Sequence, residues 1–547
     1  MKMNKLILTG ALACLAGLSA VAAEKPVFTV GMLTDTHVRT EKKTCARTKA
    51  AFELFREQKV DLVFHTGDLA DYYCPEGWRN WRETIEEVFP DAATRPRVLY
   101  ALAGHDRNGA PGEKWVEKCR GAYLEMLKTF GSDQKICEAV EFRGYTIITT
   151  SEDLWNRGEI EGLIRAACLR HPGKPVFVID HEPGYDTTTG SVLWGRRAAR
   201  ELYDKYPQVV HIGGHSHNSI RSERNIWQGG HTAVDLACLI SWNGQQDGLP
   251  SKSAQEAGVT LMDVYPDRLV FRRYDLLNNN VEIRPDERWT VPLPFDPKTA
   301  PYREEARTAR DTAPTLEGAV KAVAQPERAF RAVFPAGRHH HGIWRYECEL
   351  QRAEADGSWR ALARLRPFGD FYLPEEQRAA EVAVPFARGY FAEGGRYRFA
   401  VRAQAFSSLR SEPAYSDAFA LPPDPDLTTV WCDGEVRSLV DKGSYRCEIP
   451  LPDEVNRLPK GTKLVLSAEF RTQAAQCSLM PVGKCGKFPQ GRCYAWSSPP
   501  EDAETPLRVS FDLTKSEDDE KLFLARQTGQ AVRIDVTNLR VLAVKRK

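Results

Sequence analysis

The chain has 547 residues, of which 42% are apolar and 27% are charged. This composition is typical of a soluble globular protein and excludes a disordered or collagen-like chain, and the length predicts three or four domains. Lysine and arginine together number 75 and aspartate and glutamate 74, so the net charge is close to zero. A balance this close to neutral argues against nucleic-acid binding as the main role, and no nucleic-acid partner is expected.

Residues 1–23 differ from the rest of the chain. Lys2 and Lys5 are followed by an uncharged stretch that ends in small residues just before Glu24. This pattern predicts a secretory signal peptide, so we expect a secreted or periplasmic protein with no membrane span after cleavage. The alternative is an uncleaved anchor, because the uncharged stretch is almost long enough to cross a bilayer. Without Cys14 the cysteine count is even, which would permit disulfides in an exported protein.

The first half of the mature chain alternates strand-like and helix-like stretches. Apolar residues recur at helical spacing in 46–55, 78–89 and 113–130, which predicts three helices. Buried-strand runs alternate with them, which predicts an α/β layered domain. The expected strands are 27–33, 61–65, 98–102, 145–149, 175–179 and 209–212, and a closing hairpin is expected at 259–264 and 269–274.

The second half is dominated by strand patterns. The alternating run at 397–403, with the serines that follow it, resembles the late strand and tyrosine corner of a fibronectin type III sandwich. The proline-rich stretch at 421–426 predicts a linker. We therefore expect a first domain at 24–283, a linker or wrap at 284–314, a fibronectin type III-like sandwich at 315–421, and a C-terminal sandwich at 427–547, for which a jelly roll is one topology.

Polar motifs directly follow five of the predicted strands. Ligands gather outside the carboxyl ends of strands in α/β sheets, so the loops that carry these motifs can meet in one crevice. Carboxylates and imidazoles suit hard-to-borderline metal ions, and two ions about 3.5–4 Å apart can hold a phosphoryl group and activate a water molecule. The motifs are Asp35-Thr36-His37, Gly67-Asp68, Gly104-His105-Asp106, Asp180-His181-Glu182 and Gly214-His215-Ser216-His217.

In this order the motifs resemble those of the calcineurin-like metallophosphoesterase superfamily, over residues 27–275. The resemblance implies an α/β layered metallophosphoesterase fold, with a β-sandwich core flanked by helices, followed here by two all-β sandwich domains. It implies a metal-dependent phosphoric ester hydrolase that attacks a phosphomonoester or phosphodiester with a metal-activated hydroxide. The substrate would be a phosphorylated small molecule or a surface group, and the C-terminal domains could contact a glycan. The alternative is a non-catalytic surface or glycan-binding protein with a degenerate metallophosphoesterase domain.

The resemblance also implies the roles of eight residues. Two ions, drawn from Mn, Fe, Zn, Mg and Co, would share six ligands: Asp35, His37 and His217 for the first ion, Asp68 as the bridge, and His181 and His215 for the second. His105 would contact the phosphoryl oxygen and assist the leaving group. Asp106 would hold the His105 imidazole in the useful tautomer.

The third motif departs from the family pattern, Gly-Asn-His-Asp, in which the asparagine binds the second metal. If His105 and Asp106 keep their roles, Gly104 replaces the asparagine and the second site is weakened, with water, substrate or Asn108 filling the gap. In the competing alignment His105 takes the asparagine position and no catalytic histidine remains. We favour the first alignment because it retains the His-Asp pair.

Three further features have structural explanations as good as functional ones. His65 is expected to support the site or pack in the core. Arg107 could bind a substrate phosphate or be a surface arginine. The run at 339–341 is all histidine, but its place in the β-rich half favours a polar loop.

Overall fold

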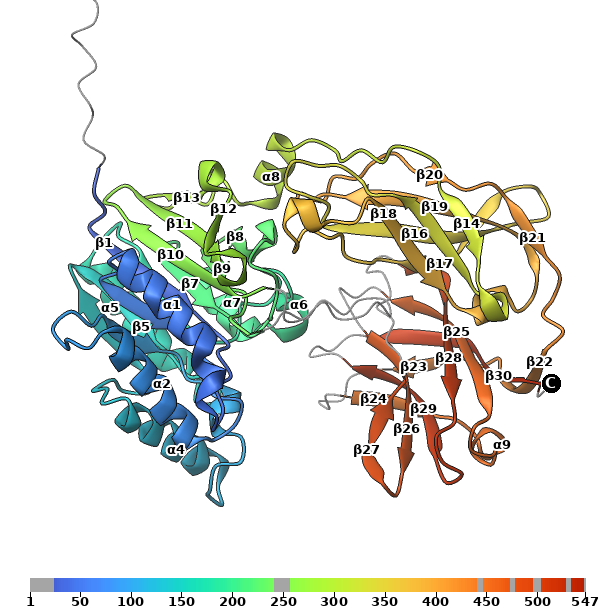
Figure 1. Cartoon of the computed structure of the whole chain (residues 1–547), viewed down its shortest axis with the longest axis horizontal. Helices are drawn as coiled ribbons and strands as arrows, with labels where there is room; N and C mark the ends of the chain where they lie inside the picture. Colours follow the sequence, from blue (N-terminus) through green and yellow to red (C-terminus); the bar gives the residue numbers. More distant parts are fainter. Residues whose placement is uncertain are drawn as a thin grey trace, which may run out of the picture.

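The computed structural model describes residues 24–240, 256–439, 446–472, 478–494, 503–527 and 533–545. The predicted signal peptide, residues 1–23, lies outside these ranges. Figure 1 shows the N-terminal domain beside two β-rich domains. Within the described ranges, no helix has the length and apolar character needed to cross a bilayer.

Two β-sheets form the centre of the first domain (Figure 1). Their strands are β1 (Phe28–Leu33), β2 (Leu62–His65), β3 (Arg97–Tyr100), β4 (Glu138–Phe142), β5 (Tyr145–Thr149), β6 (Val176–Ile179), β7 (Val209–Gly213), β8 (Ile226–Gln228), β9 (Thr232–Asp235), β10 (Gly258–Val264), β11 (Arg268–Asp275), β12 (Val281–Ile283) and β13 (Trp289–Pro292). One sheet has the order β12-β11-β10-β1-β2-β3, with β13 paired to β11, and the other β4-β5-β6-β7-β9-β8. Val30 and Phe64 of the first sheet share one buried cluster with Phe177 and Ile212 of the second.

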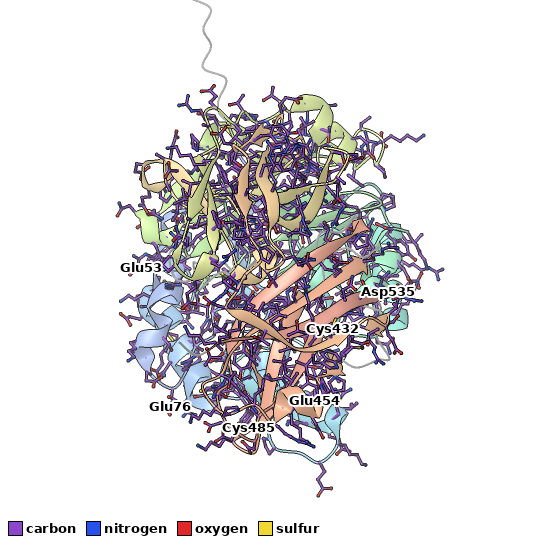
Figure 2. The ribbon with its side chains drawn as sticks, turned by 90° about the vertical axis from the view of Figure 1, so that its right-hand side faces the viewer. Glu53, Glu76, Cys432, Glu454, Cys485 and Asp535 are labelled. Carbon is purple, nitrogen blue, oxygen red and sulfur yellow. The ribbon has the colours of Figure 1, made fainter. Side chains whose placement is uncertain are left out.

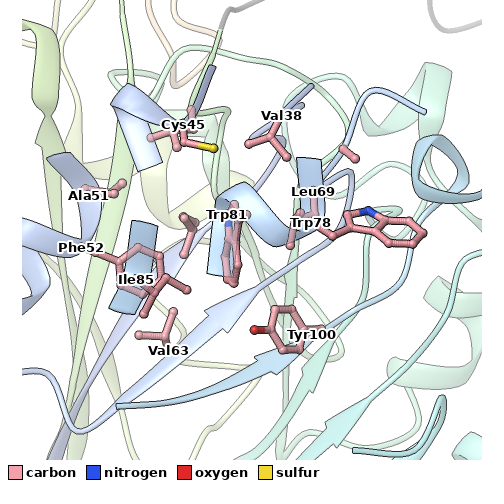
Figure 3. Packing of buried hydrophobic residues seen from close by; sticks show 14 of the residues in the cluster. Val38, Cys45, Ala51, Phe52, Val63, Leu69, Trp78, Trp81, Ile85 and Tyr100 are labelled. Atoms are coloured by element: carbon pink, nitrogen blue, oxygen red, sulfur yellow. The ribbon is translucent and has the colours of Figure 1, made fainter. Parts of the chain in front are cut away.

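Helices cover the outer faces of this sandwich. Those with apolar stripes are α1 (Ala46–Glu57), α2 (Pro75–Val88), α4 (Trp115–Thr129), α5 (Arg157–Arg170) and α7 (Arg197–Tyr203). In Figure 3, Trp81 of α2 lies among Phe52 of α1, Ile85, Val63 and Tyr100, and all of them are buried. The three helices and the closing hairpin expected from the sequence are therefore present, because their apolar spacing matches the faces they bury.

Short helical turns complete this chain. The four-residue helices are α3 (Gly104–Arg107), α6 (Ser191–Trp194) and, in the third domain, α9 (Asp453–Asn456), and α8 (Glu304–Arg310) follows β13. The 3-10 turns are η1 (Lys42–Cys45), η2 (Glu223–Asn225), η3 (Leu276–Asn278), η4 (Pro285–Glu287), η5 (Pro326–Arg328), η6 (Glu375–Gln377) and η7 (Arg388–Phe391).

The segment expected to be a linker or wrap lies against the first domain. Trp289 of β13 is buried in the cluster between the two sheets. The backbone N–H of Thr290 donates to the hydroxyl of Tyr302 at 2.7 Å, and the Arg307 guanidinium donates to the carbonyl of Glu223 at 2.7 Å. This segment therefore contributes buried contacts to the domain that carries the polar motifs.

The rest of the chain forms antiparallel sheets paired as sandwiches, which confirms the fold class expected from the sequence. The second domain contains β14 (Lys321–Ala324), β15 (Phe330–Pro335), β16 (Arg345–Ala353), β17 (Trp359–Leu365), β18 (Glu381–Phe386), β19 (Gly395–Gln404), β20 (Ala414–Tyr415) and β21 (Phe419–Leu421). Its sheets are β14-β15-β18 and β17-β16-β19-β20, with β21 on β19. The hydroxyl of Tyr397 donates to the carbonyl of Gly394 at 2.6 Å, a contact of the tyrosine-corner type.

The third domain contains β22 (Leu427–Asp433), β23 (Arg437–Leu439), β24 (Arg446–Pro450), β25 (Lys463–Thr472), β26 (Ser478–Cys485), β27 (Phe488–Cys493), β28 (Ala503–Thr514), β29 (Lys521–Gln527) and β30 (Ile534–Val544). Its sheets are β22-β30-β25-β28, with β23 on β30, and β24-β29-β26-β27. Figure 2 looks onto this domain and labels Cys432 of β22, which is exposed, and Asp535 of β30, which is partly buried.

The second domain also contacts the first near the polar motifs. Cys238, which follows β9, belongs to a buried cluster with four aromatic residues of the second domain: Trp344, Phe371, Tyr372 and Phe406. Arg224 of the first domain donates to the hydroxyl of Ser408 at 2.6 Å. The second domain therefore covers part of the surface of the first, close to the loop that carries His217.

Candidate metal centre

The six expected ligands lie in loops at the carboxyl ends of parallel strands. β1, β2 and β3 run parallel, as do β5, β6, β7 and β9, so these strand ends lie at common edges of the two sheets. Asp35 and His37 follow β1, Asp68 follows β2, His181 follows β6, and His215 and His217 follow β7.

The backbone of these loops is unusual. A positive φ is uncommon for residues other than glycine and is concentrated at functional sites. Five of the six expected ligands adopt it: Asp35 (51°), His37 (41°), Asp68 (49°), His215 (68°) and His217 (48°). The loops are therefore shaped to direct these side chains rather than to minimise local backbone energy.

Three of the ligands form a first group around Asp35. Oδ1 of Asp35 lies 3.0 Å from Nε2 of His217 and 3.6 Å from Nε2 of His37. The two Nε2 atoms are themselves 3.2 Å apart. One carboxylate oxygen and two imidazole nitrogens thus converge within the span of a single ion's coordination shell.

The other three form a second group around Asp68. Nε2 of His181 lies 3.1 Å from Oδ2 of Asp68 and 3.0 Å from Nδ1 of His215. The same Oδ2 is 3.9 Å from Nε2 of His37 in the first group. Asp68 therefore lies between the two groups, where a carboxylate can bridge two ions.

The charges of the site offset the cost of burying it. Burial alone would raise the pKa of Asp35, but the facing imidazoles, His217 foremost, hold it well below its usual range. Burial opposes protonation of His217, yet Asp35 raises its pKa to about 11. Burial also opposes protonation of His181, but Asp68, Asp35 and Glu152 raise its pKa well above the usual value. Without a metal, the buried carboxylates thus hold protons on neighbouring imidazoles.

These residues fit a pair of metal ions. Each group offers one carboxylate and two imidazoles, which is a donor set for borderline divalent metals. The imidazole nitrogens face each other at 3.2 Å and 3.0 Å beside buried carboxylates, as expected where a cation replaces the shared protons.

His105 lies beside the first group rather than in the second. Its ring contacts that of His37, with centroids 4.8 Å apart, and its Nε2 is 4.0 Å from Oδ2 of Asp68. The side chain is 44% exposed, so it can meet a substrate. This placement favours the alignment in which His105 is not a ligand of the second metal.

Asp106 does not hold the His105 imidazole, contrary to the expectation from the sequence. Its buried carboxylate accepts a hydrogen bond from the backbone N–H of Ala70 at 2.8 Å, and burial together with Asp68 raises its pKa to about 7. The group that Nδ1 of His105 meets is the backbone carbonyl of Asp71, at 2.9 Å. Asp106 faces away because it is buried beneath the loop of Asp68, where it binds the backbone.

Asp71 was missed by the sequence reasoning as a part of the site. Its carboxylate lies 3.3 Å from Nδ1 of His37 and 3.7 Å from Nδ1 of His105, and Arg39 pairs with it at 2.7 Å. It comes three residues after Asp68, so its place in the same loop was the available signal. Carboxylates in this position orient metal-binding imidazoles.

Glu152 was missed as well. It follows β5, and its Oε2 accepts a hydrogen bond of 2.8 Å from the backbone N–H of Gly104. Burial raises the pKa of Glu152 to about 7. The signal in the sequence was an acidic residue three positions after the end of β5, whose neighbour β6 leads into a ligand loop.

Of the three features with two explanations, His65 and Arg107 have structural roles, whereas His339 and His341 of the histidine run form with Asp311 a further group whose ligand atoms lie within 4.8 Å of one another. His65 is buried, with Nε2 3.2 Å from the hydroxyl of Thr36 and Nδ1 accepting from the N–H of Gly67. Arg107 forms an ion pair of 3.1 Å with Asp153. In the histidine run, Nε2 of His339 donates to Asp311 at 2.9 Å, because Nδ1 accepts from the backbone of the same run.

A family model described as calcineurin-like phosphoesterase matches residues 28–219, which include all six expected ligands together with His105 and Asp106. Residues 28–219 form a calcineurin-like phosphoesterase domain. No curated protein matches the chain.

Solved structures resemble parts of the chain. A dimetal phosphatase from Danio rerio is 12% identical, covers 49% of this chain and 99% of its own, and gives a TM-score of 0.33. Yfce, a phosphoesterase from E. coli, is 14% identical; the match covers 47% of this chain and 96% of Yfce, with a TM-score of 0.23. The CBM22-1 xylan-binding domain of Xyn10C from Paenibacillus barcinonensis is 12% identical; the match covers 22% of this chain and 87% of that domain, with a TM-score of 0.16.

Proposed function

We propose that the protein is an exported, metal-dependent phosphoesterase that hydrolyses a phosphomonoester or a phosphodiester. The observation that carries this proposal is the position of Asp68, whose Oδ2 lies 3.1 Å from His181 of one ligand group and 3.9 Å from His37 of the other. When bound, two metal ions would activate a water molecule and stabilise the charge that develops on the phosphoryl group.

Asp35, His37 and His217 would hold the first ion, and His181 and His215 the second. The ligands lie in short loops that directly follow strands, and five of the six have a positive φ. The strand ends and the loop backbone therefore fix the positions of these side chains before any ion binds. This preorganisation lowers the cost of assembling the site.

His105 would act on the leaving group. Its Nδ1 must carry a proton to bond the carbonyl of Asp71, because a carbonyl only accepts, and Nε2 is therefore the nitrogen that exchanges protons with substrate. The backbone N–H of His105 also donates to Oδ1 of Asp68 at 3.1 Å, which ties the position of this ring to that of the bridging carboxylate.

The test combines hydrolysis with metal analysis. The metal-free protein is loaded with Mn, Fe, Zn, Mg or Co and assayed on a generic phosphomonoester and a generic phosphodiester, with His105→Ala as the matched variant. We expect about two ions per chain, metal-dependent hydrolysis, and loss of most activity but not of metal in His105→Ala. Bound metal without hydrolysis of either class would instead indicate the non-catalytic binding protein.

Export is part of the proposal and is tested separately. Its support is the apolar stretch between Lys5 and Glu24. We expect the mature protein outside the cytoplasm, with its N-terminus near Ala22 or Ala23 when sequenced. An intact N-terminus on a cytoplasmic protein would reject export.

Glycan contact is proposed for the second domain. Its support is a cavity of about 710 Å³ whose lining combines the aromatic rings of Tyr346, Phe371 and Tyr372 with the charged Arg338 and Asp370. Rings with a few placed polar groups are typical of small-ligand sites. The test is electrophoresis of the protein in gels that contain polysaccharides. Slower migration that Arg338→Ala reduces would support glycan contact, and equal migration in gels with and without polysaccharide would reject it.

A further inference from the structure

The second ligand group lacks a protein donor at Gly104, where no side chain exists. A Cβ at this position would lie 3.1 Å from Oε1 and 3.4 Å from Oε2 of Glu152. The carboxylate of a residue far away in the sequence therefore occupies the space into which a side chain at 104 would project. Asn108, the other candidate considered for this gap, is exposed and is hydrogen-bonded to Arg107.

The backbone holds Glu152 in this place. The backbone N–H of Glu152 donates to the carbonyl of Leu102 at 2.8 Å, so the segment after β5 is paired with the segment after β3. The N–H of Gly104 donates to Oε2 of Glu152, and the next N–H, of His105, donates to Oδ1 of Asp68. Two consecutive amides thus bind two carboxylates, which brings like charges close together.

Such a pair of carboxylates is stabilised either by a proton on one of them or by a cation that both can bind. The residues around Glu152 already have their own partners: Asp153 pairs with Arg107, and Glu182 pairs with Arg196. In the described part of the chain, no ion pair includes Glu152. The carboxylate of Glu152 therefore has no arginine or lysine partner in the described ranges, and it interacts electrostatically with Asp68 and His181 of the second group.

We infer that Glu152 supplies the missing protein ligand of the second metal, in place of the side chain absent at Gly104. This inference rests on the proposed function, because it requires a second ion at Asp68, His181 and His215. The sequence compensates for the glycine with a carboxylate from the neighbouring strand end, and the second site has four protein donors rather than three.

The experiment measures metal binding to the full chain by calorimetry and by metal analysis after desalting. Glu152→Ala should retain the first ion and bind the second at least tenfold more weakly, since even residues that only support a ligand contribute about 10–100-fold. Glu138→Gln removes the same charge on β4, which pairs with β5, and should bind both ions as the wild type does. Glu152→Asp keeps the charge but shortens the side chain by one methylene group, so its oxygens no longer reach the metal. This variant should also bind the second ion more weakly.

A double variant gives the decisive comparison. Gly104→Asn alone would crowd Glu152, whereas Gly104→Asn combined with Glu152→Ala has room for the amide and should recover the second ion. Position 104 does not require a positive φ, so asparagine is tolerated by the backbone. Wild-type affinity in folded Glu152→Ala and Glu152→Asp would overturn the inference. A wild type that binds fewer than two ions would instead overturn the dinuclear site itself.

Discussion

Nδ1 of His37 lies 3.3 Å from Oδ1 of Asp71, while Nε2 on the other side of the ring faces Asp35 and His217. The imidazole thus lies between two carboxylates, one near each ring nitrogen. A partner of this kind fixes the tautomer of a metal-binding histidine and increases its basicity.

Asp71→Asn should therefore weaken binding of the first ion by about 10–100-fold, because the amide lacks the negative charge that faces Nδ1 of His37. Calorimetric titration of the metal-free protein measures this change. Asp91→Asn, in an exposed turn, is the matched control and should have no effect. Equal affinity of Asp71→Asn and the wild type would show that Asp71 does not act on His37.

Asp68→Asn should lower the amount of bound metal more than a change at any other expected ligand. The carboxylate of Asp68 lies between the two ligand groups, so its loss removes a donor from each ion. It also removes the negative charge that reduces the repulsion between the two metal ions. We expect less than one ion per chain by elemental analysis and no detectable hydrolysis. A folded Asp68→Asn protein that still holds two ions would be incompatible with a bridging role.

The first domain should remain active without the β-sandwiches, provided that the chain ends after Thr312 rather than near Pro297. Ending at Pro297 removes Tyr302 and Arg307, which bond Thr290 and the carbonyl of Glu223. Each of these partly buried hydrogen bonds contributes about 1 kcal/mol, and each kcal/mol corresponds to about 2–4 °C in Tm. The shorter chain should therefore unfold several degrees lower.

Both shortened chains uncover Cys238, so their comparison isolates the contribution of residues 298–312. Thermal unfolding and hydrolysis of a small phosphoester are measured on each. If the chain ending at Thr312 folds but is inactive, the second domain completes the site through its contacts with Cys238, whose thiol lies against His217.

Stability should fall as the pH rises through the range in which Glu256 ionises. Burial raises the pKa of Glu256 to about 8 in the folded protein, against about 4.5 in an unfolded chain. Between these values the folded state holds the proton and the unfolded state does not, so the free energy of unfolding decreases with pH, by at most about 1.4 kcal/mol per unit.

Glu256→Gln cannot ionise, so it should match the wild type near pH 5 and be more stable than it near pH 8.5. Its amide can still bond to Ser219, the partner of Oε1 at 3.0 Å. Chemical denaturation at the two pH values gives the difference. A variant that is equally destabilised at both would show that the carboxyl group ionises without cost.

Much of the fold follows from local patterns in the sequence. The helices around Phe52, Trp81 and Tyr123 bury the stripes that their spacing marks, and the alternating runs of the second half pair as antiparallel sheets. The motifs from Asp35 to His217 could also be found in advance, because each directly follows a strand and parallel strands deliver their ends to one edge.

Tertiary structure decided which side chains meet. The sequence suggests Asp106 as the partner of the adjacent His105, but the chain turns Asp106 inward to Ala70 and brings Asp71 to the imidazole instead. Nothing local connects Gly104 with Glu152, and only the pairing of their strand ends places the carboxylate where the glycine leaves room. Strand ends are fixed by the apolar pattern of each segment, whereas contacts between loops depend on the order of strands in the sheet, which no single segment encodes.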